Sequence, residues 1–318
     1  MSVRNRVASW AAALAAASSL LVGCQKADGP ETPMVAFAQA NSQDPWRQVF
    51  DAEIRAEAAK HSAEFSFELQ DAQDDANKQI GVIETFLVKK PKVLLVSPCE
   101  VAVTQACEKA FDQGIPVILL DRSIESDKYT CWIGGDNVAI GRAAGEFAGK
   151  ALGGKGTVLM VQGLAGATPT VDRRNGFLEA IKSYPEVKVL EGDHCDYQRQ
   201  KARSYMETFL QTGKQFDAVY AHNDEMAIGA YLALEAAGMK GKTILGIDAC
   251  QKEIVDYLQA GKVTATFVYP TPGAKGIQVA SQILKGGSPP DKKIVLPTKA
   301  VTKENAEEFL NDNPNLVK

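Results

Sequence analysis

Lys92–Ser97 (KVLLVS) and Pro116–Asp121 (PVILLD) are two nearly continuous apolar stretches, and they determine the fold class of this chain. A strand with one face in water alternates apolar and polar residues, whereas a strand buried on both faces of a parallel sheet is apolar throughout. Both stretches therefore predict central strands of a parallel sheet that is covered by helices on its two faces.

Similar β-rich segments alternate with helical segments from Met34 onward. We predict strands at Val35–Gln39, Phe65–Gln70, Val93–Ser97, Ile115–Leu120, Thr157–Gln162, Val187–Glu191, Ala218–His222 and Thr243–Ile247. We predict helices after Asp44-Pro45 and at Asp75–Val88, Val101–Asp112, Asn137–Leu152, Val171–Ser183, Gln198–Gln211, Glu225–Ala237 and Gly273–Leu284. This alternation implies right-handed crossovers and a doubly wound α/β architecture.

The number of strands indicates two lobes. About ten strands are too many for one compact sheet of this type, and the pattern restarts at Gly153–Gly156 (GGKG), just before the strand TVLMVQ. A chain of 318 residues is also long enough for two domains with separate cores. The expected fold is therefore α/β, with two doubly wound parallel-sheet lobes.

Composition and motifs exclude several classes of function. The formal net charge of -4 argues against a nucleic-acid partner, which normally needs a basic surface. No cysteine pair has CxxC spacing and the three histidines are scattered, so we expect no metal site and no cofactor. The chain contains no GxSxG, no HExxH and no nucleophile–base pair, and nothing singles out Asp196 or Asp224 as a catalytic acid. We expect a protein that is not an enzyme.

The N-terminus has the pattern of an export signal. Arg4 and Arg6 precede an apolar, alanine-rich run from Val7 to Val22, which is too short for a membrane span. Residues 21–24 (LVGC) resemble the lipobox of bacterial lipoproteins, which implies that residues 1–23 are removed and Cys24 is acylated. An ordinary signal peptide with a chance cysteine is the alternative. Residues 24–33 then form a tether, and we expect an exported protein, in the periplasm or at the cell surface, anchored through Cys24.

Polar side chains follow directly after several predicted strands. They are Asn41–Arg47, Asp121-Arg122, His222–Asp224 and Asp248. Each has a structural explanation, because Asp121-Arg122 can form a turn, Asp44 or Asp224 can cap a helix, and Trp46 can lie in a core. Ligands of open α/β sheets, however, bind beyond the carboxyl ends of the strands, so their common position favours a binding cleft.

The residue types indicate a sugar. Asp and Asn accept or donate hydrogen bonds in fixed planes, and the rigid guanidinium of Arg bridges neighbouring hydroxyl groups. An aromatic face covers the C–H patch of a sugar ring. A nucleotide site would need a glycine-rich phosphate cradle between a strand and a helix, and Gly153–Gly156 precedes a strand instead.

Five motifs together resemble a known family. They are SQDPWR (42–47), IPVILLDRSI (115–124), DRRNGFLEAI (172–181), YAHNDEMAIGA (220–230) and GIDA (246–249). From Met34 to Leu296 the chain resembles the ribose-type periplasmic sugar-binding proteins of ABC importers, and within them the galactofuranose-binding subgroup. The resemblance implies a monosaccharide ligand, galactofuranose-, galactose- or ribose-like, an ABC permease as partner and a monomeric protein.

The resemblance also implies the ligand contacts. The matching positions are Trp46, Arg47, Asp121, Arg122, Arg173, Tyr197, Asn223 and Asp248. The chain departs from the family at Tyr269, where many relatives have Gln or Glu, and at Cys250, which replaces a glycine. Tyr269 is therefore a further candidate contact whose type alters the pocket.

Hinge closure is the mechanism that the resemblance implies, with three crossings between lobes near Gly135-Asp136, Tyr269 and Lys292. The N-terminal lobe would comprise residues 34–135 plus 270–291, and the C-terminal lobe residues 136–269 plus 292–318. A receptor that presents its ligand to a sensor kinase or chemoreceptor is the alternative function. A repressor with this fold would carry a helix-turn-helix where this chain has the export pattern.

Five cysteines follow Cys24, and the odd number leaves at least one thiol unpaired. Cys195 and Cys250 flank Tyr197 and Asp248, so a disulfide between them is possible in an oxidising compartment. Such a bond would restrain the loops of the cleft before a ligand binds.

Overall fold

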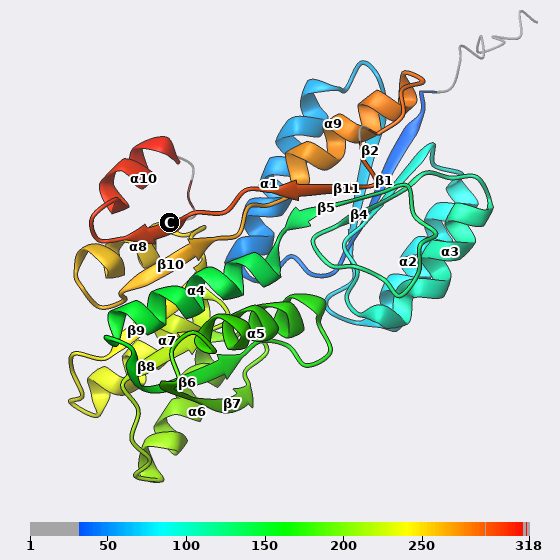
Figure 1. Ribbon diagram of the computed structural model, residues 1–318. Coiled ribbons are helices and arrows are strands. Elements are labelled where there is room, and N and C mark those ends of the chain that lie inside the picture. The colour runs from blue at the N-terminus through cyan, green and yellow to red at the C-terminus, as the bar shows by residue number, and fades with distance from the viewer. Residues whose placement is uncertain (1–31, 290, 314–315, 317–318) are drawn as a thin grey trace, which may run out of the picture. The chain divides into compact units, whose positions relative to one another are not determined.

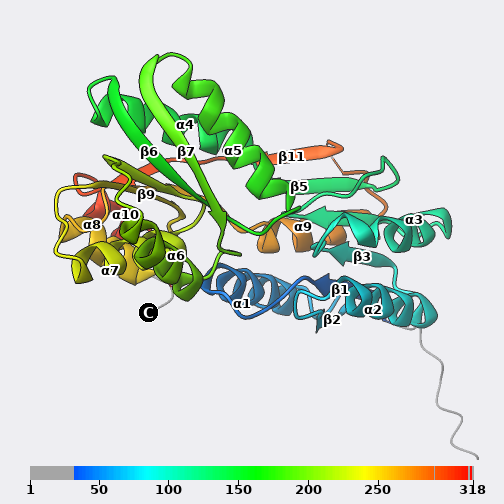
Figure 2. The ribbon, with the colours of Figure 1, turned by 90° about the horizontal axis from the view of Figure 1, so that it is seen from below.

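The computed structural model describes residues 32–289, 291–313 and 316. The expected export signal (1–23), Cys24 and most of the tether (24–33) lie outside these residues. The chain from Thr32 onward forms two α/β lobes, each around its own six-stranded sheet (Figures 1 and 2). The predicted fold class is confirmed. None of the helices in the described ranges is long and apolar enough to span a membrane.

The first lobe contains a parallel sheet with the strand order β11-β5-β4-β3-β1-β2. Its strands are β1 (Met34–Gln39), β2 (Ser66–Asp71), β3 (Val93–Val96), β4 (Val117–Leu120), β5 (Cys131–Gly135) and β11 (Lys293–Leu296). Its helices are α1 (Pro45–Lys60), α2 (Ala76–Lys89), η1 (Val101–Val103), α3 (Thr104–Asp112) and α9 (Gly273–Leu284). Leu95 packs in the core under α1 and α9, whereas Leu94 packs in the core under α2 and α3. Both faces of β3 are therefore buried, as its apolar sequence predicts.

The second lobe contains a sheet with the strand order β12-β10-β9-β8-β6-β7, parallel except for β12. Its strands are β6 (Lys155–Gln162), β7 (Glu186–His194), β8 (Ala218–Ala221), β9 (Thr243–Asp248), β10 (Ala265–Val268) and β12 (Ala300–Thr302). Its helices are α4 (Asn137–Ala151), α5 (Thr168–Ile181), α6 (Arg199–Gln211), α7 (Asp224–Ala236), α8 (Lys252–Gln259) and α10 (Ala306–Asp312). Met160 packs toward α4 and α5, and Leu159 packs toward α6 and α7.

The chain passes between the lobes after β5, after β10 and after β11. The third crossing differs from the prediction. We expected it near Lys292, with residues 292–318 in the C-terminal lobe, but Lys293–Leu296 pairs with β5 in the first sheet. The crossing therefore follows Leu296. Side chains along β11 are half-buried or exposed, so this strand has no apolar run that could have marked its sheet in the sequence.

The strands β5, β10, β11 and β12 and the helices α8 and α10 were not among the predicted segments. These strands have only three to five residues. The sequence of β5 (CWIGG) also ends in two glycines, which are disfavoured in strands. Their pairing depends on the neighbouring strand and not on a local pattern.

Two glycines allow α4 and α5 to touch through their backbones. A Cβ atom at Gly141 would lie 2.2 Å from the carbonyl oxygen of Arg173, and one at Gly176 would lie 2.1 Å from the carbonyl oxygen of Val138. Carbon atoms do not approach backbone oxygens so closely, so only glycine fits at both positions. The contact fixes the helix that carries Arg173.

We expect Gly176→Ala to lower the free energy of unfolding by roughly 1–3 kcal/mol, because the added methyl group forces the two helices apart. Urea unfolding measures the change. Gly81→Ala is the matched control, since Gly81 is an exposed position of α2 where an added Cβ would have no atom within 4 Å. There the same substitution is expected to stabilise by about 0.5–1 kcal/mol. Equal changes in the free energy of unfolding for the two variants would contradict the close contact between α4 and α5.

Candidate functional site

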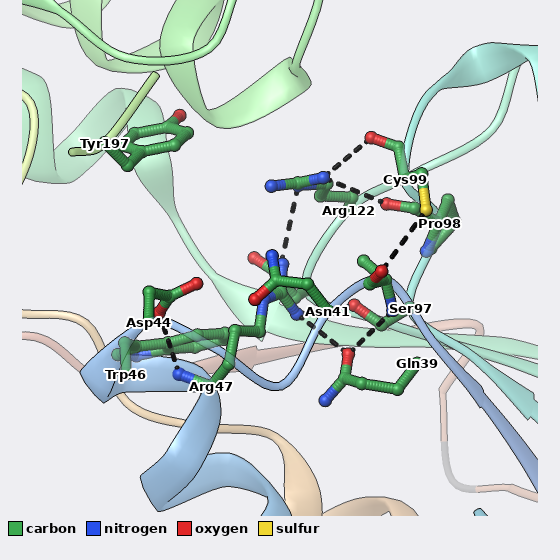
Figure 3. Close-up of polar contacts among 12 residues, drawn as sticks. Gln39, Asn41, Asp44, Trp46, Arg47, Ser97, Pro98, Cys99, Arg122 and Tyr197 are labelled. Carbon is green, nitrogen blue, oxygen red and sulfur yellow. Dashed lines mark hydrogen bonds and ion pairs between the residues drawn. The ribbon is translucent and has the colours of Figure 1, made fainter. Parts of the chain in front are cut away.

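All nine candidate ligand contacts line one hollow between the two lobes. Its cavity volume is about 40 Å³, below the roughly 300–1,000 Å³ usual for small-molecule sites, so the two lobes lie close together around a narrow space. The first lobe contributes Trp46, Arg47, Asp121 and Arg122, and the second contributes Arg173, Tyr197, Asn223 and Asp248. Tyr269 lies at the second crossing between them. In Figure 3, Tyr197, Arg122 and Asp44 surround the space above the Trp46 indole.

Arg47 and Asp121 form a buried ion pair at the carboxyl ends of β1 and β4. Nη1 of Arg47 also donates hydrogen bonds to Oγ of Ser97 at 2.7 Å and to Oε1 of Gln39 at 3.3 Å. A buried charge needs a counter-charge and further hydrogen bonds to be tolerated, and this guanidinium has both. The pair therefore forms a rigid wall of the hollow.

Tyr269 connects the ion pair to the second lobe. Its hydroxyl donates to Oδ1 of Asp121 at 2.5 Å and accepts from Nδ2 of Asn137 at 3.3 Å. Burial raises the pKa of Tyr269 well above its ordinary value, and the neighbouring Asp121 carboxylate raises it further, so the phenol stays protonated and can donate. The Tyr269 side chain thus joins both lobes at the hinge.

The Tyr269 ring lies between an indole and a guanidinium. Trp46 stacks on it with ring centroids 5.0 Å apart and an interplanar angle of 22°. The guanidinium carbon of Arg173 lies 4.6 Å from the centroid of the same ring. Nε1 of Trp46 also donates to the backbone oxygen of Tyr269 at 2.7 Å. One face of the Trp46 indole is thereby covered by Tyr269, and the guanidinium carbon of Arg47 lies 4.8 Å from the indole centroid.

Arg173 is held by second-lobe groups. Its Nε donates to Oδ1 of Asn137 at 2.8 Å, and Nη1 donates to the carbonyl oxygen of His222. Nη2 lies 3.9 Å from Oδ1 of Asp248, too far for a hydrogen bond. Burial raises the pKa of Asp248 well above its ordinary value, and the positive charge of Arg173 opposes that shift. Within the described chain, no side-chain hydrogen bond reaches the Asp248 carboxylate, so its oxygens can accept from a ligand.

Arg122 has donors that remain free. Nη1 donates to the carbonyl oxygen of Cys99 at 2.7 Å (Figure 3). Nε lies 3.9 Å from Oδ2 of Asp121. Its side chain is only 7% exposed. Among the described residues, Nη2 has no hydrogen-bond partner, so it can donate into the hollow.

Tyr197 and Asn223 form the opposite wall. Oδ1 of Asn223 accepts from the backbone N–H of Met226 at 2.9 Å and caps α7, while Nδ2 donates to the backbone oxygen of Tyr197 at 3.1 Å. The Tyr197 hydroxyl is 2.6 Å from Oγ1 of Thr170. The amide of Asn223 therefore serves mainly to cap the helix and position Tyr197.

Backbone strain is concentrated at this site. Asp121, Tyr197 and Asp248 have φ values of 70°, 61° and 127°, in the region that L residues rarely adopt. Such conformations cost roughly 1–3 kcal/mol each and persist where surrounding contacts impose them. Three lining residues share this property, which is typical of a functional site.

Asp44 and Pro169 complete the lining, and neither was among the candidate contacts. Asp44 caps α1 by accepting from the backbone N–H of Arg47 at 2.9 Å, which fits its predicted role as a cap. Burial raises the pKa of Asp44, and Arg47 opposes that shift. The position after β1 could have identified Asp44 as a lining residue. No sequence signal distinguishes Pro169.

The disulfide that the sequence made possible between Cys195 and Cys250 is not formed, and the five cysteines of the described residues all carry free thiols. Cys195 is buried in the core under α6 and α7, and Cys250 in the core that includes Tyr269. The flanking loops meet at the hollow, but the two thiols point into different cores.

The lining groups are electrically balanced. Asp44, Asp121 and Asp248 face Arg47, Arg122 and Arg173, so three carboxylates meet three guanidiniums. Among the described residues, no group of three or more His, Cys, Asp or Glu side chains is arranged to hold a metal ion. The arrangement offers hydrogen bonds in both directions and an aromatic face, which suits a neutral polyhydroxylated ring.

Known proteins resemble this chain over most of its length. Residues 35–288 match the family model described as periplasmic binding protein domain. The galactofuranose-binding protein YtfQ of Escherichia coli (strain K12) is 31% identical over 296 residues, which cover 89% of this chain and 92% of that protein. The ribose import binding protein RbsB of the same organism is 33% identical over 237 residues, which cover 71% and 78%.

One solved structure belongs to a signalling protein. The fructose binding periplasmic domain of the hybrid two component system BT1754 is 36% identical and superposes with a TM-score of 0.84, covering 89% of this chain and 94% of that one.

Proposed function

This chain belongs to the periplasmic binding protein family, as its motifs indicated, and from that membership we propose that it binds a monosaccharide in the hollow between its lobes and delivers it to an ABC permease. The observation that carries the proposal is the convergence of eleven side chains from both lobes and the hinge on one hollow. The protein acts by binding and release, without chemical change to the sugar.

Closure of the lobes is the proposed binding step. Asp44 and Arg122 come from the first lobe, and Asp248 from the second, and each retains hydrogen-bonding capacity toward the hollow. A ligand that bonds to both lobes favours the closed arrangement, because only there are all contacts made. The closed surface is then recognised by the permease.

The ligand class follows from the relatives and the charge balance. One relative is named for galactofuranose and another for ribose import. We propose a neutral monosaccharide, galactofuranose-, galactose- or ribose-like, that contacts the Trp46 indole in the lining of the hollow. The proposed location is outside the inner membrane, with the protein anchored through Cys24.

A signalling receptor is the second candidate function. The similarity to a fructose binding domain of a two component system favours it. Cross-linking of the protein in bacterial membranes loaded with sugar discriminates the two functions. A permease recovered in the cross-linked product supports import, and a sensor kinase recovered there supports signalling.

We expect Arg122→Ala and Asp248→Ala each to weaken sugar binding at least roughly tenfold, because each leaves a buried group unsatisfied at about 1–3 kcal/mol or more. Isothermal titration calorimetry with a sugar that stabilises the wild type measures the change, and circular dichroism checks the fold. Arg203→Ala is the control, because Arg203 forms an exposed ion pair with Glu207 on α6. Unchanged affinity in both pocket variants would remove this site assignment.

We expect neutral sugars to bind and their charged counterparts to fail. An additional negative charge enters a hollow whose three cations already face three carboxylates, so it is desolvated without a counter-ion. Thermal shift with D-galactose against D-galacturonate, and with D-ribose against D-ribose 5-phosphate, compares matched rings. Tighter binding of either charged sugar would contradict the proposed ligand class.

We expect Cys24→Ala to release the exported protein from the membrane, because the acylated thiol is the proposed anchor. Fractionation of bacteria that express the full chain, with labelled palmitate, measures anchoring. Cys107→Ala is the control, since Cys107 is buried in the first lobe and should leave anchoring intact. An unlabelled wild-type protein in the soluble fraction would indicate an ordinary signal peptide.

A further inference from the structure

The loop after β9 has an unusual backbone at two consecutive residues. Asp248 has a φ of 127° and Ala249 a φ of 54°, and neither is a glycine. Side chains of L residues clash with the backbone in this region, so the conformation needs external contacts to persist. The loop matters because Asp248 directs its carboxylate into the hollow and shares no side-chain hydrogen bond with the described residues.

Asp224 supplies one of these contacts. It is the first residue of α7 and is fully buried, and its Oδ2 accepts the backbone N–H of Ala249 at 2.7 Å. Its Oδ1 accepts the hydroxyl of Thr266 on β10 at 2.6 Å. Both carboxylate oxygens are therefore bound, one to the strained loop and one to the neighbouring strand.

The sheet leaves room for this carboxylate. A Cβ atom at Gly246 on β9 would lie 2.2 Å from Oδ1 of Asp224. Gly246 thus allows Asp224 to lie directly against β9, close to the end of the strand. On the other side of the loop, the backbone N–H of Tyr269 donates to the carbonyl oxygen of Asp248 at 3.2 Å. The strained peptide is held at both of its ends.

We propose that Asp224 is a positioning residue for sugar binding, because it fixes the Ala249 N–H and so holds the Asp248 carboxylate in the hollow. This inference rests on the proposed function, since Asp248 is taken as a ligand contact. Asp224 itself does not line the hollow. Its effect on affinity is exerted through the loop.

The competing explanation is a purely structural one, in which Asp224 ties α7 to β10 through Thr266. The two explanations separate because each uses a different oxygen of the same carboxylate. Thr266→Val removes the structural hydrogen bond and leaves the Ala249 contact in place. Asp224→Ala removes both.

A conservative variant provides a further distinction. Burial raises the pKa of Asp224 to about 7. In Asp224→Asn, the amide oxygen can accept from Ala249 and the amide nitrogen can donate to the Thr266 hydroxyl. The loop should then remain in place.

Isothermal titration calorimetry measures the sugar affinity of each variant. The ligand is D-ribose or D-galactose, whichever binds the wild type. We expect Asp224→Ala to lose roughly tenfold to hundredfold in affinity, the usual effect of removing a hydrogen bond to a charged group. Asp224→Asn and Thr266→Val should stay within about threefold of the wild type, although Thr266→Val lowers the melting temperature. Wild-type affinity in Asp224→Ala, or an equal loss in Thr266→Val, would overturn the proposal.

Amide hydrogen exchange on the wild-type protein provides a second test, which needs no ligand and no variant. The Ala249 amide of the sugar-free wild type should be as well protected as the amides of β9, because it is bonded to a buried carboxylate. Rapid exchange at Ala249 would overturn the positioning role by itself. Failure of every sugar to bind the wild type, with Ala249 protected, would instead count against the proposed function alone.

Discussion

The structure depends on the burial of six charged side chains in one hollow, because ions removed from water are tolerated only when other ions or hydrogen bonds meet them. Arg47 and Asp121 meet this requirement within the first lobe, and Tyr269 adds a hydrogen bond from the hinge. Arg173 meets it with Asn137 and the His222 carbonyl in the second lobe. Each lobe thus supplies hydrogen-bond partners for its own buried arginine, Arg47 or Arg173.

The polar atoms that have no hydrogen-bond partner in the described protein are the ones that can bind a ligand. Arg122 and Asp248 form an open pair that belongs to different lobes. Nη2 of Arg122 has no hydrogen-bond partner among the described residues, and the Asp248 carboxylate has only Nη2 of Arg173 at 3.9 Å. A hydroxylated ring between them would donate to one and accept from the other. The aromatic stack of Trp46 on Tyr269 places an apolar surface beside these polar groups. Arg47, Asp121, Tyr269 and Arg173 thus form a framework whose polar groups already have partners, while Arg122 and Asp248 keep polar atoms for a ligand. This division allows the site to be stable and still able to bind.

Much of this could be predicted from the sequence, for identifiable reasons. The apolar runs of β3 and β4 predicted buried strands, and the polar residues at the strand ends predicted a cluster of side chains in one hollow, because parallel strands end at a common edge. Asp44 was recognised as a helix cap but not as a lining residue, since a local pattern reveals only the local role. The position of β11 was missed because an exposed strand of four residues is defined by its partner β5. The separation of Cys195 from Cys250 depends on which core each thiol enters, and loop proximity does not determine that.

The bonds among Arg47, Asp121 and Tyr269 also limit how this protein can diverge. Replacing Asp121 alone leaves the buried Arg47 cation without its counter-charge, and replacing Tyr269 alone removes a hydrogen-bond donor to Asp121, so each single change has a structural cost. Arg122 and Asp248 carry no such obligation toward one another. Under the proposed function, new sugar preferences are accessible by single changes at Arg122 or Asp248, whereas a change at Arg47 or Asp121 also disturbs a buried ion pair.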